Sequence, residues 1–244
     1  MADSQPMLEF ESVTAGYISE VDVLRDLSLR IRTGSLTSII GANGAGKSTV
    51  LRAIYGFARI RRGRVLLEGQ EITNLAPSDL LPRGVAYVAQ GRCNFPEMTV
   101  QENLAIACYT RRDDNRRRDT EAMLDRFPLL REKSRTPAGN LSGGQQQILE
   151  MAMALVMQPK LLLIDEPTLG LSPKFFDEVF KQILQVRQEG VTVLMVEQNA
   201  ARALEISDVG IVLELGTKLM EDTGASILAD PSVRARYLGG HAET

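Results

Sequence analysis

The chain of 244 residues contains no tryptophan, one histidine and two cysteines, Cys93 and Cys108. The histidine, His241, stands close to the last residue of the sequence, so we expect no catalytic or metal-binding role for it. The two cysteines form no paired motif, which predicts reduced thiols of a cytosolic protein rather than a disulfide framework or a zinc site. Metal chemistry based on histidine or cysteine is therefore not expected.

Long apolar runs and a strong charge imbalance are also missing. The longest apolar run, 151–157, is far shorter than the roughly 18 residues that a membrane helix needs. The first residues lack the basic and then apolar pattern of a secretory signal. Lys and Arg number 28 against 31 Asp and Glu, a balance that calls for no nucleic-acid partner. We expect a soluble globular chain.

The most informative segment that is present is the glycine-rich stretch from Gly41 to Thr49. Its sequence, GANGAGKST, fits the pattern G-x-x-x-x-G-K-[ST] at every fixed position. The apolar, β-branched stretch 36–40 before it is typical of a buried strand, and 48–55 after it has the apolar spacing of a helix. Strand, glycine loop and helix in this order predict a phosphate-binding loop, whereas a glycine-rich turn without a ligand is the alternative.

Within this loop the glycines allow backbone N–H groups to turn inward toward an anion. We expect Lys47 to reach the outer phosphates of a nucleotide and the Ser48 hydroxyl to bind Mg²⁺. The predicted phosphate-binding residues are Gly41, Asn43, Gly44, Gly46, Lys47, Ser48 and Thr49.

A second motif is the run from Leu161 to Glu166, four apolar residues followed by two acids. A buried parallel strand delivers its last residues to the ligand edge of a sheet. Asp165 is then placed to bind Mg²⁺, and Glu166 to orient and deprotonate an attacking water. The alternative is a strand that simply ends in a polar turn, since Pro167 follows.

A third motif, Leu141 to Gln145, begins a predicted helix that runs through Met157. Ser142 is a favourable N-cap, and Gly143 and Gly144 permit close backbone approach. A helix start of this kind is a second anion-binding surface. Because the chain already has a phosphate loop, a second surface suggests a second chain.

The pattern of apolar residues predicts an α/β fold with a parallel sheet flanked by helices. We expect antiparallel strands near the N-terminus, then strands alternating with helices from Leu36 onward, and an inserted helical part without strands. The predicted single domain spans 7–240, with a nucleotide-binding core at 7–97 and 138–240 and a helical subdomain at 98–137. Predicted strands cover 7–14, 21–32, 36–40, 85–88, 160–165, 191–196, 208–213 and 218–222, and a further helix covers 174–189.

Taken together, the motifs resemble the ATP-binding cassette (ABC) ATPases over about residues 7–237. The shared order is Tyr17, the phosphate loop, Gln90, Leu-Ser-Gly-Gly-Gln at 141–145 and the Asp165-Glu166 pair. The resemblance implies ATP and Mg²⁺ as cofactors and a head-to-tail dimer. Each ATP would lie between one subunit's phosphate loop and the other's Ser142, Gly143, Gly144 and Gln145.

The resemblance also implies roles for three further residues. Tyr17 would stack on adenine, although a lone aromatic near a turn is also typical of the core or rim. Gln90 would reach Mg²⁺ and sense the γ-phosphate. Gln198 stands where most ABC ATPases have a histidine that contacts the γ-phosphate, and its alternative is a capping or surface glutamine.

The chain is more closely similar to the ATPase subunits of branched-chain amino acid importers. The similarity lies in Gly91-Arg92, Phe95-Pro96, 99–104, 169–173 and 196–200. Urea and amide importer ATPases share much of it. Besides Gln198, the departures from the general ABC pattern are Ser172 for an aspartate, and Ile148 and Met153 where arginines are usual. These last three concern coupling within the dimer rather than ATP binding.

The resemblance implies an ATP-hydrolysing importer subunit, peripheral on the cytoplasmic face of the cell membrane. Its partners would be transmembrane permease subunits, a second ABC ATPase subunit and, indirectly, a solute-binding protein, with no nucleic acid. The alternatives are a urea or amide importer, an exporter subunit, a ribosome- or DNA-directed ABC ATPase and a nucleotide switch that does not hydrolyse ATP.

Overall fold

A computed structural model describes residues 5–18, 20–109 and 115–237. His241 and residues 238–240 of the expected domain lie outside this part of the chain. The described strands are β1 (Leu8–Gly16), β2 (Leu24–Ile31), β3 (Leu36–Ile40), β4 (Arg59–Leu67), β5 (Gln70–Glu71), β6 (Val85–Val88), β7 (Leu161–Asp165), β8 (Thr192–Val196), β9 (Val209–Glu214) and β10 (Thr217–Thr223). The described helices are α1 (Lys47–Ile54), α2 (Pro77–Leu80), α3 (Val100–Ala107), α4 (Arg116–Arg126), α5 (Pro128–Glu132), α6 (Gly143–Leu155), α7 (Pro173–Gln188), α8 (Ala200–Ile206), α9 (Gly224–Ala229) and α10 (Pro231–Tyr237), with 3₁₀ turns η1 (Leu81–Arg83) and η2 (Ala138–Asn140).

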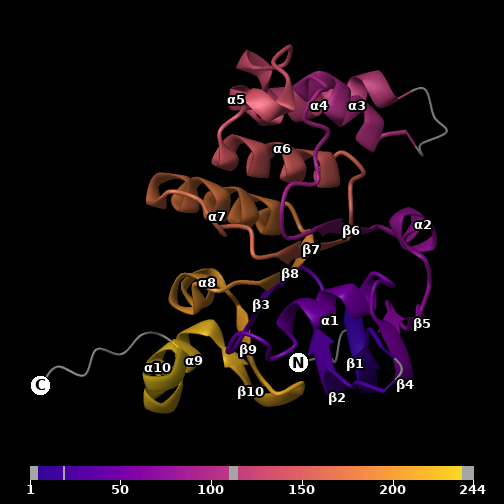
Figure 1. Cartoon of the computed structure of the whole chain (residues 1–244), viewed down its shortest axis with the longest axis vertical. Helices are drawn as coiled ribbons and strands as arrows, with labels where there is room; N and C mark the ends of the chain where they lie inside the picture. The colour runs from indigo at the N-terminus through magenta and orange to yellow at the C-terminus, as the bar shows by residue number, and fades with distance from the viewer. Residues whose placement is uncertain (1–4, 19, 110–114, 238–244) are drawn as a thin grey trace, which may run out of the picture.

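The larger sheet has the strand order β10-β9-β3-β8-β7-β6, in which β9, β3, β8, β7 and β6 run parallel and β10 is antiparallel to β9. Its central strands are buried on both faces because helices cover both. In β7, Leu161 and Leu163 pack in the apolar cluster that contains α1, whereas Leu162 and Ile164 pack in the cluster that contains α6 and α7. The sheet therefore separates α1 from α6 and α7, as Figure 1 shows.

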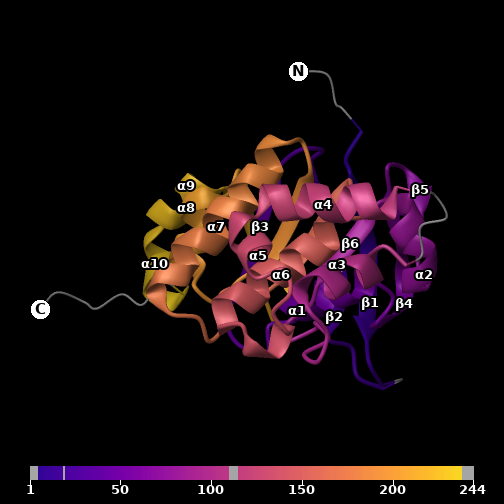
Figure 2. The same ribbon diagram turned by 90° about the horizontal axis from the view of Figure 1, so that it is seen from above.

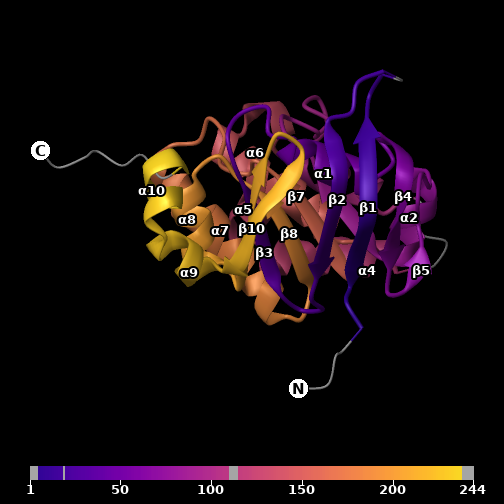
Figure 3. The same cartoon turned by 90° about the horizontal axis from the view of Figure 1, so that it is seen from below.

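The smaller sheet is antiparallel, with the order β2-β1-β4-β5. Figure 3 shows β2, β1 and β4 side by side. Buried residues of these strands join the cluster of α1, so α1 is packed between the two sheets. Three described strands after Leu36 do not continue the expected parallel sheet: β4 and β5 belong to the antiparallel sheet, and β10 is antiparallel to β9. Residues Arg59 to Leu67 return to pair with β1 and leave several arginines at the surface, where a one-sided strand is solvated.

Residues 98–137 contain α3, α4 and α5 and, outside the undescribed 110–114, no strand. The two chain segments that enter and leave this part are hydrogen-bonded to one another. Val100 N donates to Thr136 O at 3.0 Å, and Ala138 N donates to Met98 O at 2.8 Å. Figure 2, from above, shows α3, α4, α5 and α6 over one face of the molecule.

Most expected elements differ from the observed ones by a few residues at their ends. The helix after Ser142 is predicted to reach Met157 but ends at Leu155. The reason lies just beyond it, where Gln158 adopts a left-handed backbone with φ of 52° that a continuing helix does not allow. The described part of the chain holds no helix with the length and apolar character needed to cross a lipid bilayer.

Candidate nucleotide-binding site

The candidate site lies where three neighbouring parallel strands end. Strands β3, β8 and β7 are adjacent, and each is followed by a polar segment at the same edge of the sheet. The phosphate loop follows β3, Asp165 and Glu166 close β7, and Glu197 and Gln198 follow β8. Sequence segments more than a hundred residues apart are thereby brought together at the edge where open α/β sheets bind ligands.

The conformation of the phosphate loop requires glycine at two positions. Gly41 has φ of 151°, and a side chain there would place Cβ 2.2 Å from the Leu213 carbonyl oxygen. Gly46 has φ of 99° and is the N-cap of α1. The loop is also supported from β9–β10, because Gly216 N donates to Ala45 O at 2.9 Å. The start of α1 therefore faces the cleft with its N–H groups available to an anion.

Lys47 is buried and folds back over its own loop. Its Nζ donates to Gly41 O at 2.9 Å and to Ala42 O at 3.0 Å. Burial lowers the pKa of the Lys47 ammonium, while the nearby carboxylates of Glu166, Asp165 and Glu197 act in the opposite direction. Lys47 is the only cationic side chain among the residues that line the cleft, and it is held beside the loop and near these three carboxylates.

Asp165 is almost fully buried and accepts two hydrogen bonds. Ser48 Oγ donates to Asp165 Oδ1 at 2.7 Å, and the Tyr87 hydroxyl donates to Oδ2 at 3.0 Å. Burial and then the charge of Asp165 raise the pKa of Tyr87, so its hydroxyl stays protonated and remains a donor. The Ser48 hydrogen bond joins the first turn of α1 to the end of β7, and the Tyr87 hydrogen bond joins β6 to the same carboxylate.

The donor set suits Mg²⁺. Ser48 and Asp165 supply oxygen atoms, and Gln90 can add its amide oxygen, which are the hard ligands that Mg²⁺ prefers. No group of three or more His, Cys, Asp or Glu side chains is arranged to hold a metal within the described residues. A few oxygen donors without a cluster of protein ligands fit a Mg²⁺ ion that is held by one or two protein groups together with substrate phosphates.

Glu166 follows Asp165 with its carboxylate beside Gln90, whose Nε2 donates to Oε2 at 2.9 Å. Its backbone has φ of 48°, a left-handed conformation that is uncommon for glutamate, and its N–H donates to Val196 O at 2.8 Å. Burial first, and then the neighbouring Asp165 and Glu197, raise the pKa of Glu166, whereas Lys47 lowers it. A carboxylate with a raised pKa is suited to act as a general base.

Gln198 follows β8, lines this cleft and is exposed. Its backbone N–H and that of Asn199 donate to Glu197 Oε1 at 2.8 and 3.0 Å. The other carboxylate oxygen of Glu197, Oε2, is buried without a hydrogen-bond partner among the described residues. The turn after β8 is therefore fixed by its backbone, and the Gln198 side chain extends into the cleft.

If the Gln198 amide donates to the γ-phosphate, as the resemblance implies, replacing Gln198 by alanine should lower ATP hydrolysis by roughly 10- to 150-fold, because one charge-assisted hydrogen bond of about 1.5–3 kcal/mol is lost. Histidine at this position should keep activity and add a titration near pH 6.5 to the rate profile. Steady-state phosphate release measures both, with Gln188→Ala on the far end of α7 as the control. Parent-like hydrolysis by Gln198→Ala would mean that the γ-phosphate is sensed through Gln90 and Lys47.

The cleft at this edge has a volume of about 440 Å³. It is lined by Val23, Asn43, Gly44, Gly46, Lys47, Ser48, Thr49, Gln90, Glu166, Leu169 and Gln198. Tyr17 is not among them, but it lies at its margin, where its hydroxyl is 3.2 Å from Thr49 Oγ1. The Tyr17 ring is about half exposed, which leaves a face for a flat ligand.

Residues 142–145 are not brought into this cleft. They form the start of α6, at which Ser142 and Gly143 are exposed and Gly144 is buried. Gln145 N donates to Ser142 Oγ at 3.4 Å, and Ser142 N donates to Gln145 Oε1 at 3.0 Å. This reciprocal capping box leaves Gly143 exposed at the helix start. The predicted helix start is thus formed and lies outside the cleft of the chain's own phosphate loop, and its binding of an anion stays a prediction.

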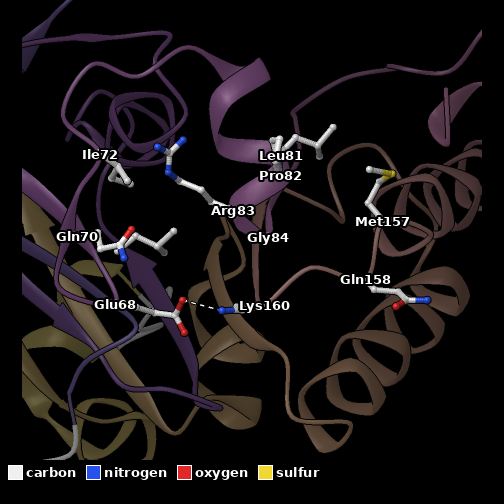
Figure 4. Close-up of a pocket in the computed structure, with 11 residues that line it drawn as sticks. Glu68, Gln70, Ile72, Leu81, Pro82, Arg83, Gly84, Met157, Gln158 and Lys160 are labelled. Atoms are coloured by element: carbon white, nitrogen blue, oxygen red, sulfur yellow. Dashed lines mark hydrogen bonds and ion pairs between the residues drawn. The ribbon is translucent and has the colours of Figure 1, made fainter. Parts of the chain in front are cut away.

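A second hollow, of about 530 Å³, lies at the opposite edge of the sheet (Figure 4). Gly84 before β6 and Lys160 before β7 form part of its wall, and Lys160 Nζ pairs with Glu68 Oε2 at 2.8 Å. It contains none of the phosphate-loop or acidic residues described above. Its size therefore does not make it a competing nucleotide site.

Two residues of the site escape prediction from the sequence. Tyr87 contacts Asp165 only because β6 lies beside β7, and strand order is not encoded in a local pattern. Glu197 lies in the segment 196–200, which carries part of the family resemblance. It is an acid at the end of a buried strand, as Asp165 is, and this is the signal that could have identified it.

Comparison with known proteins agrees with this geometry. Residues 24–169 match the protein family described as ABC transporter. The chain is 43% identical to the high-affinity branched-chain amino acid transport ATP-binding protein BraG of Pseudomonas aeruginosa over 96% of this chain and 100% of that protein. It is also 43% identical to the probable branched-chain amino acid transport ATP-binding protein LivF of Archaeoglobus fulgidus, over 91% of this chain and 94% of that protein. A solved ATP-binding cassette of an ABC transporter in its ADP conformation superposes with a TM-score of 0.85 and 30% identity, covering 97% and 100% of the two chains.

Proposed function

Because this chain belongs to the ABC transporter family, we propose that it is the ATP-hydrolysing subunit of an importer for branched-chain amino acids. The observation that carries the proposal is the contact of Ser48 Oγ with Asp165 Oδ1 at 2.7 Å, which joins the phosphate loop to the strand that presents Glu166. Phosphate-binding backbone, metal-binding oxygens and a candidate base are thereby gathered in one cleft.

In this proposal the triphosphate lies along the loop 41–49, with Lys47 at the outer phosphates. Mg²⁺, held by Ser48, Asp165 and Gln90, would neutralise phosphate charge when bound. Glu166 orients a water in line with the γ-phosphate and accepts its proton, which its raised pKa favours. Gln90 and Gln198 approach the γ-phosphate from two sides. Positioning and electrostatic stabilisation account for most of the rate in such a reaction.

The working unit would be a dimer, because Ser142 and Gly143 at the start of α6 are exposed and lie outside the cleft of their own chain. Ser142, Gly143, Gly144 and Gln145 of one chain would close over the nucleotide that the other chain holds. A helix start with an exposed serine and glycine is suited to a phosphate oxygen.

Changing Ser142 to arginine should leave ATP binding to the monomer intact but reduce hydrolysis by about a hundredfold, since the bulky side chain prevents closure over the partner's nucleotide. Mixing this variant with Lys47→Ala should restore one complete site per heterodimer. Equilibrium nucleotide binding and phosphate release give the two readouts, with Gln101→Arg at an exposed position of α3 as the control. Weak ATP binding by monomeric Ser142→Arg would contradict action across the dimer.

The surface for a permease would be an apolar hollow of about 220 Å³ where β6 faces α6. It is lined by Tyr55, Leu81, Ala86, Tyr87, Val88, Ala89, Cys93, Ala107, Glu150, Met153, Ala154 and Met157. Beside it, the Tyr55 and Phe57 rings lie 5.5 Å apart, and Phe57 is 55% exposed. An exposed phenylalanine beside an apolar hollow is typical of a protein-binding surface, and we assign this surface to an apolar cytoplasmic segment of a permease.

The names of the two relatives support branched-chain amino acids as the solute. An external solute-binding protein would deliver the solute to the permease, so that this chain supplies the work without reading the solute itself. The proposal places the chain on the cytoplasmic face of the membrane, held there by its permease partners.

Purification of the tagged chain from gently solubilised membranes should yield permease subunits and a second ATPase chain, the same or related. ATP hydrolysis by this complex in vesicles should rise when leucine-loaded binding protein is added. Phe57→Asp should lose the permease but keep hydrolysis by the isolated chain, whereas Leu219→Asp, an exposed apolar residue of β10, should keep both. Stimulation by urea instead of leucine, or recovery without any membrane protein, would contradict the proposal.

A further inference from the structure

Glu150 is a buried acid that the site does not use. It lies in the apolar stretch of α6, where its neighbours Leu149 and Met151 are fully buried, and its own side chain is 6% exposed. Burying a carboxylate without partners is costly, so its presence in this helix calls for compensating hydrogen bonds. Glu150 finds them in the loop that begins at Gln90.

Both hydrogen bonds go to one atom of the acid. Cys93 N donates to Glu150 Oε1 at 2.8 Å, and Asn94 Nδ2 donates to the same oxygen at 2.8 Å. A backbone group and a side chain of the loop are therefore tied to α6. The loop between β6 and α3 cannot shift at this point without breaking both contacts or moving α6.

The far half of the same loop is tied to α3 by Asn103, which is fully buried. Its Oδ1 accepts from Phe95 N at 2.8 Å, and its Nδ2 donates to the carbonyl oxygens of Phe95, Met98 and Thr99 at 3.0, 3.1 and 2.9 Å. The segment from Cys93 to Thr99 thus has one attachment on each of two helices. Only the portion that carries Gln90 lies outside these attachments.

The helix that holds Glu150 is the one that begins at Ser142. Eight residues separate the two, about 12 Å along a continuous α-helix. The capping box at Ser142 and the buried face of α6 make this stretch a rigid element. A displacement of the Gln90 loop is therefore passed to the helix start through Glu150 rather than absorbed between them.

We propose that Glu150 is a positioning residue that ties the Gln90 loop to α6, so that each chain couples contact with its own ATP to its contact with the partner's ATP. The inference rests on the proposed ATPase dimer. It assigns to one side chain the connection between Gln90, which hydrogen-bonds Glu166, and Ser142, which would face the second nucleotide.

The test is steady-state ATP hydrolysis by the full-length chain at varied ATP. Glu150→Ala should lower kcat about tenfold while the KM for ATP stays within about twofold, because the phosphate loop is untouched. Glu150→Gln should keep kcat within about twofold of the parent, since its amide oxygen can accept both hydrogen bonds. Ile183→Val, a small loss of packing in the same apolar cluster, is the control and should leave kcat unchanged.

Asn94→Ala removes one of the two donors without altering α6 and should lower kcat in the same direction. Combining it with Glu150→Ala should add nothing further, because both changes break the same connection. Parent-like kcat for Glu150→Ala, or equal losses in Glu150→Ala and Glu150→Gln, would overturn the inference. If Glu150→Ala does not fold, an unchanged kcat in Asn94→Ala overturns it instead. Absence of hydrolysis by the parent chain would count against the proposed function and not against this connection alone.

Discussion

Replacement of Lys47 by alanine is expected to abolish ATP binding at physiological nucleotide concentrations. The Lys47 ammonium is buried against the loop carbonyls of Gly41 and Ala42, where an outer phosphate would meet it. Its removal also takes away the only ammonium group that offsets the nearby carboxylates of Asp165, Glu166 and Glu197 among the residues lining the cleft. Two charge-assisted hydrogen bonds of about 1.5–3 kcal/mol each correspond to a loss of affinity of at least about a hundredfold.

Isothermal titration with ATP and Mg²⁺ measures this loss directly. Lys181→Ala, which removes an exposed lysine of α7, should bind ATP as the parent does and controls for the change in net charge. The thermal midpoint of Lys47→Ala without nucleotide should stay close to that of the parent. Near-normal ATP affinity in the variant would refute the assignment of 41–49 as the phosphate loop.

Glu166→Gln is expected to keep ATP binding and nearly stop turnover. The amide has nearly the same shape as the carboxylate but cannot accept the proton of the attacking water. We expect kcat to fall by about 10²–10⁴-fold, with ATP-bound dimer accumulating on size-exclusion chromatography. Glu205→Gln on exposed α8 is the control, and hydrolysis at the parent rate in Glu166→Gln would mean that another group is the base.

We expect the same residue to set the acid side of the pH profile. The base must be deprotonated to act, and burial raises the pKa of Glu166 above its ordinary value of 4.5. Protonation therefore begins at a higher pH than for an exposed glutamate, and the parent rate should decline as pH falls through this raised pKa. The residual rate of Glu166→Gln should lack this decline, which single-turnover measurements across pH can resolve.

The parts of the site that lie within one continuous segment could be predicted from the sequence. The phosphate loop, the acids after Leu161 to Ile164 and the helix start at Ser142 are each defined by neighbours a few residues away. The patterns that indicate buried strands, glycine-rich phosphate loops and helix caps depend on residues only a few positions apart. The assignments of Tyr17, Gln90 and Gln198 depended on the family resemblance, and their roles stay predictions.

What the sequence could not provide depends on pairing between distant segments. The arginines of β4 interrupt the apolar pattern of a strand, so β4 is recognised only once its pairing with β1 is known. Tyr87 reaches Asp165 only because β6 and β7 are neighbouring strands. Glu150 obtains its hydrogen-bond donors only when the loop at Cys93 lies against α6. In each case the physical cause is a long-range contact whose partner a single-segment pattern does not name.

Because of the strand order, the sheet around the phosphate loop can be completed only late in synthesis. Strand β3, which ends at the phosphate loop, pairs on one side with β8 and on the other with β9, both from the last quarter of the chain. Gly216 then supports Ala45 of the loop itself. While the ribosome is still making the middle of the protein, β3 has neither neighbour, and its apolar residues are exposed to aggregation or to chaperones. The phosphate loop is translated before the motifs at 141–145 and 161–166, but the sheet that holds it is completed only after β8 and β9 have been made. ATP can therefore assist only the final steps of folding.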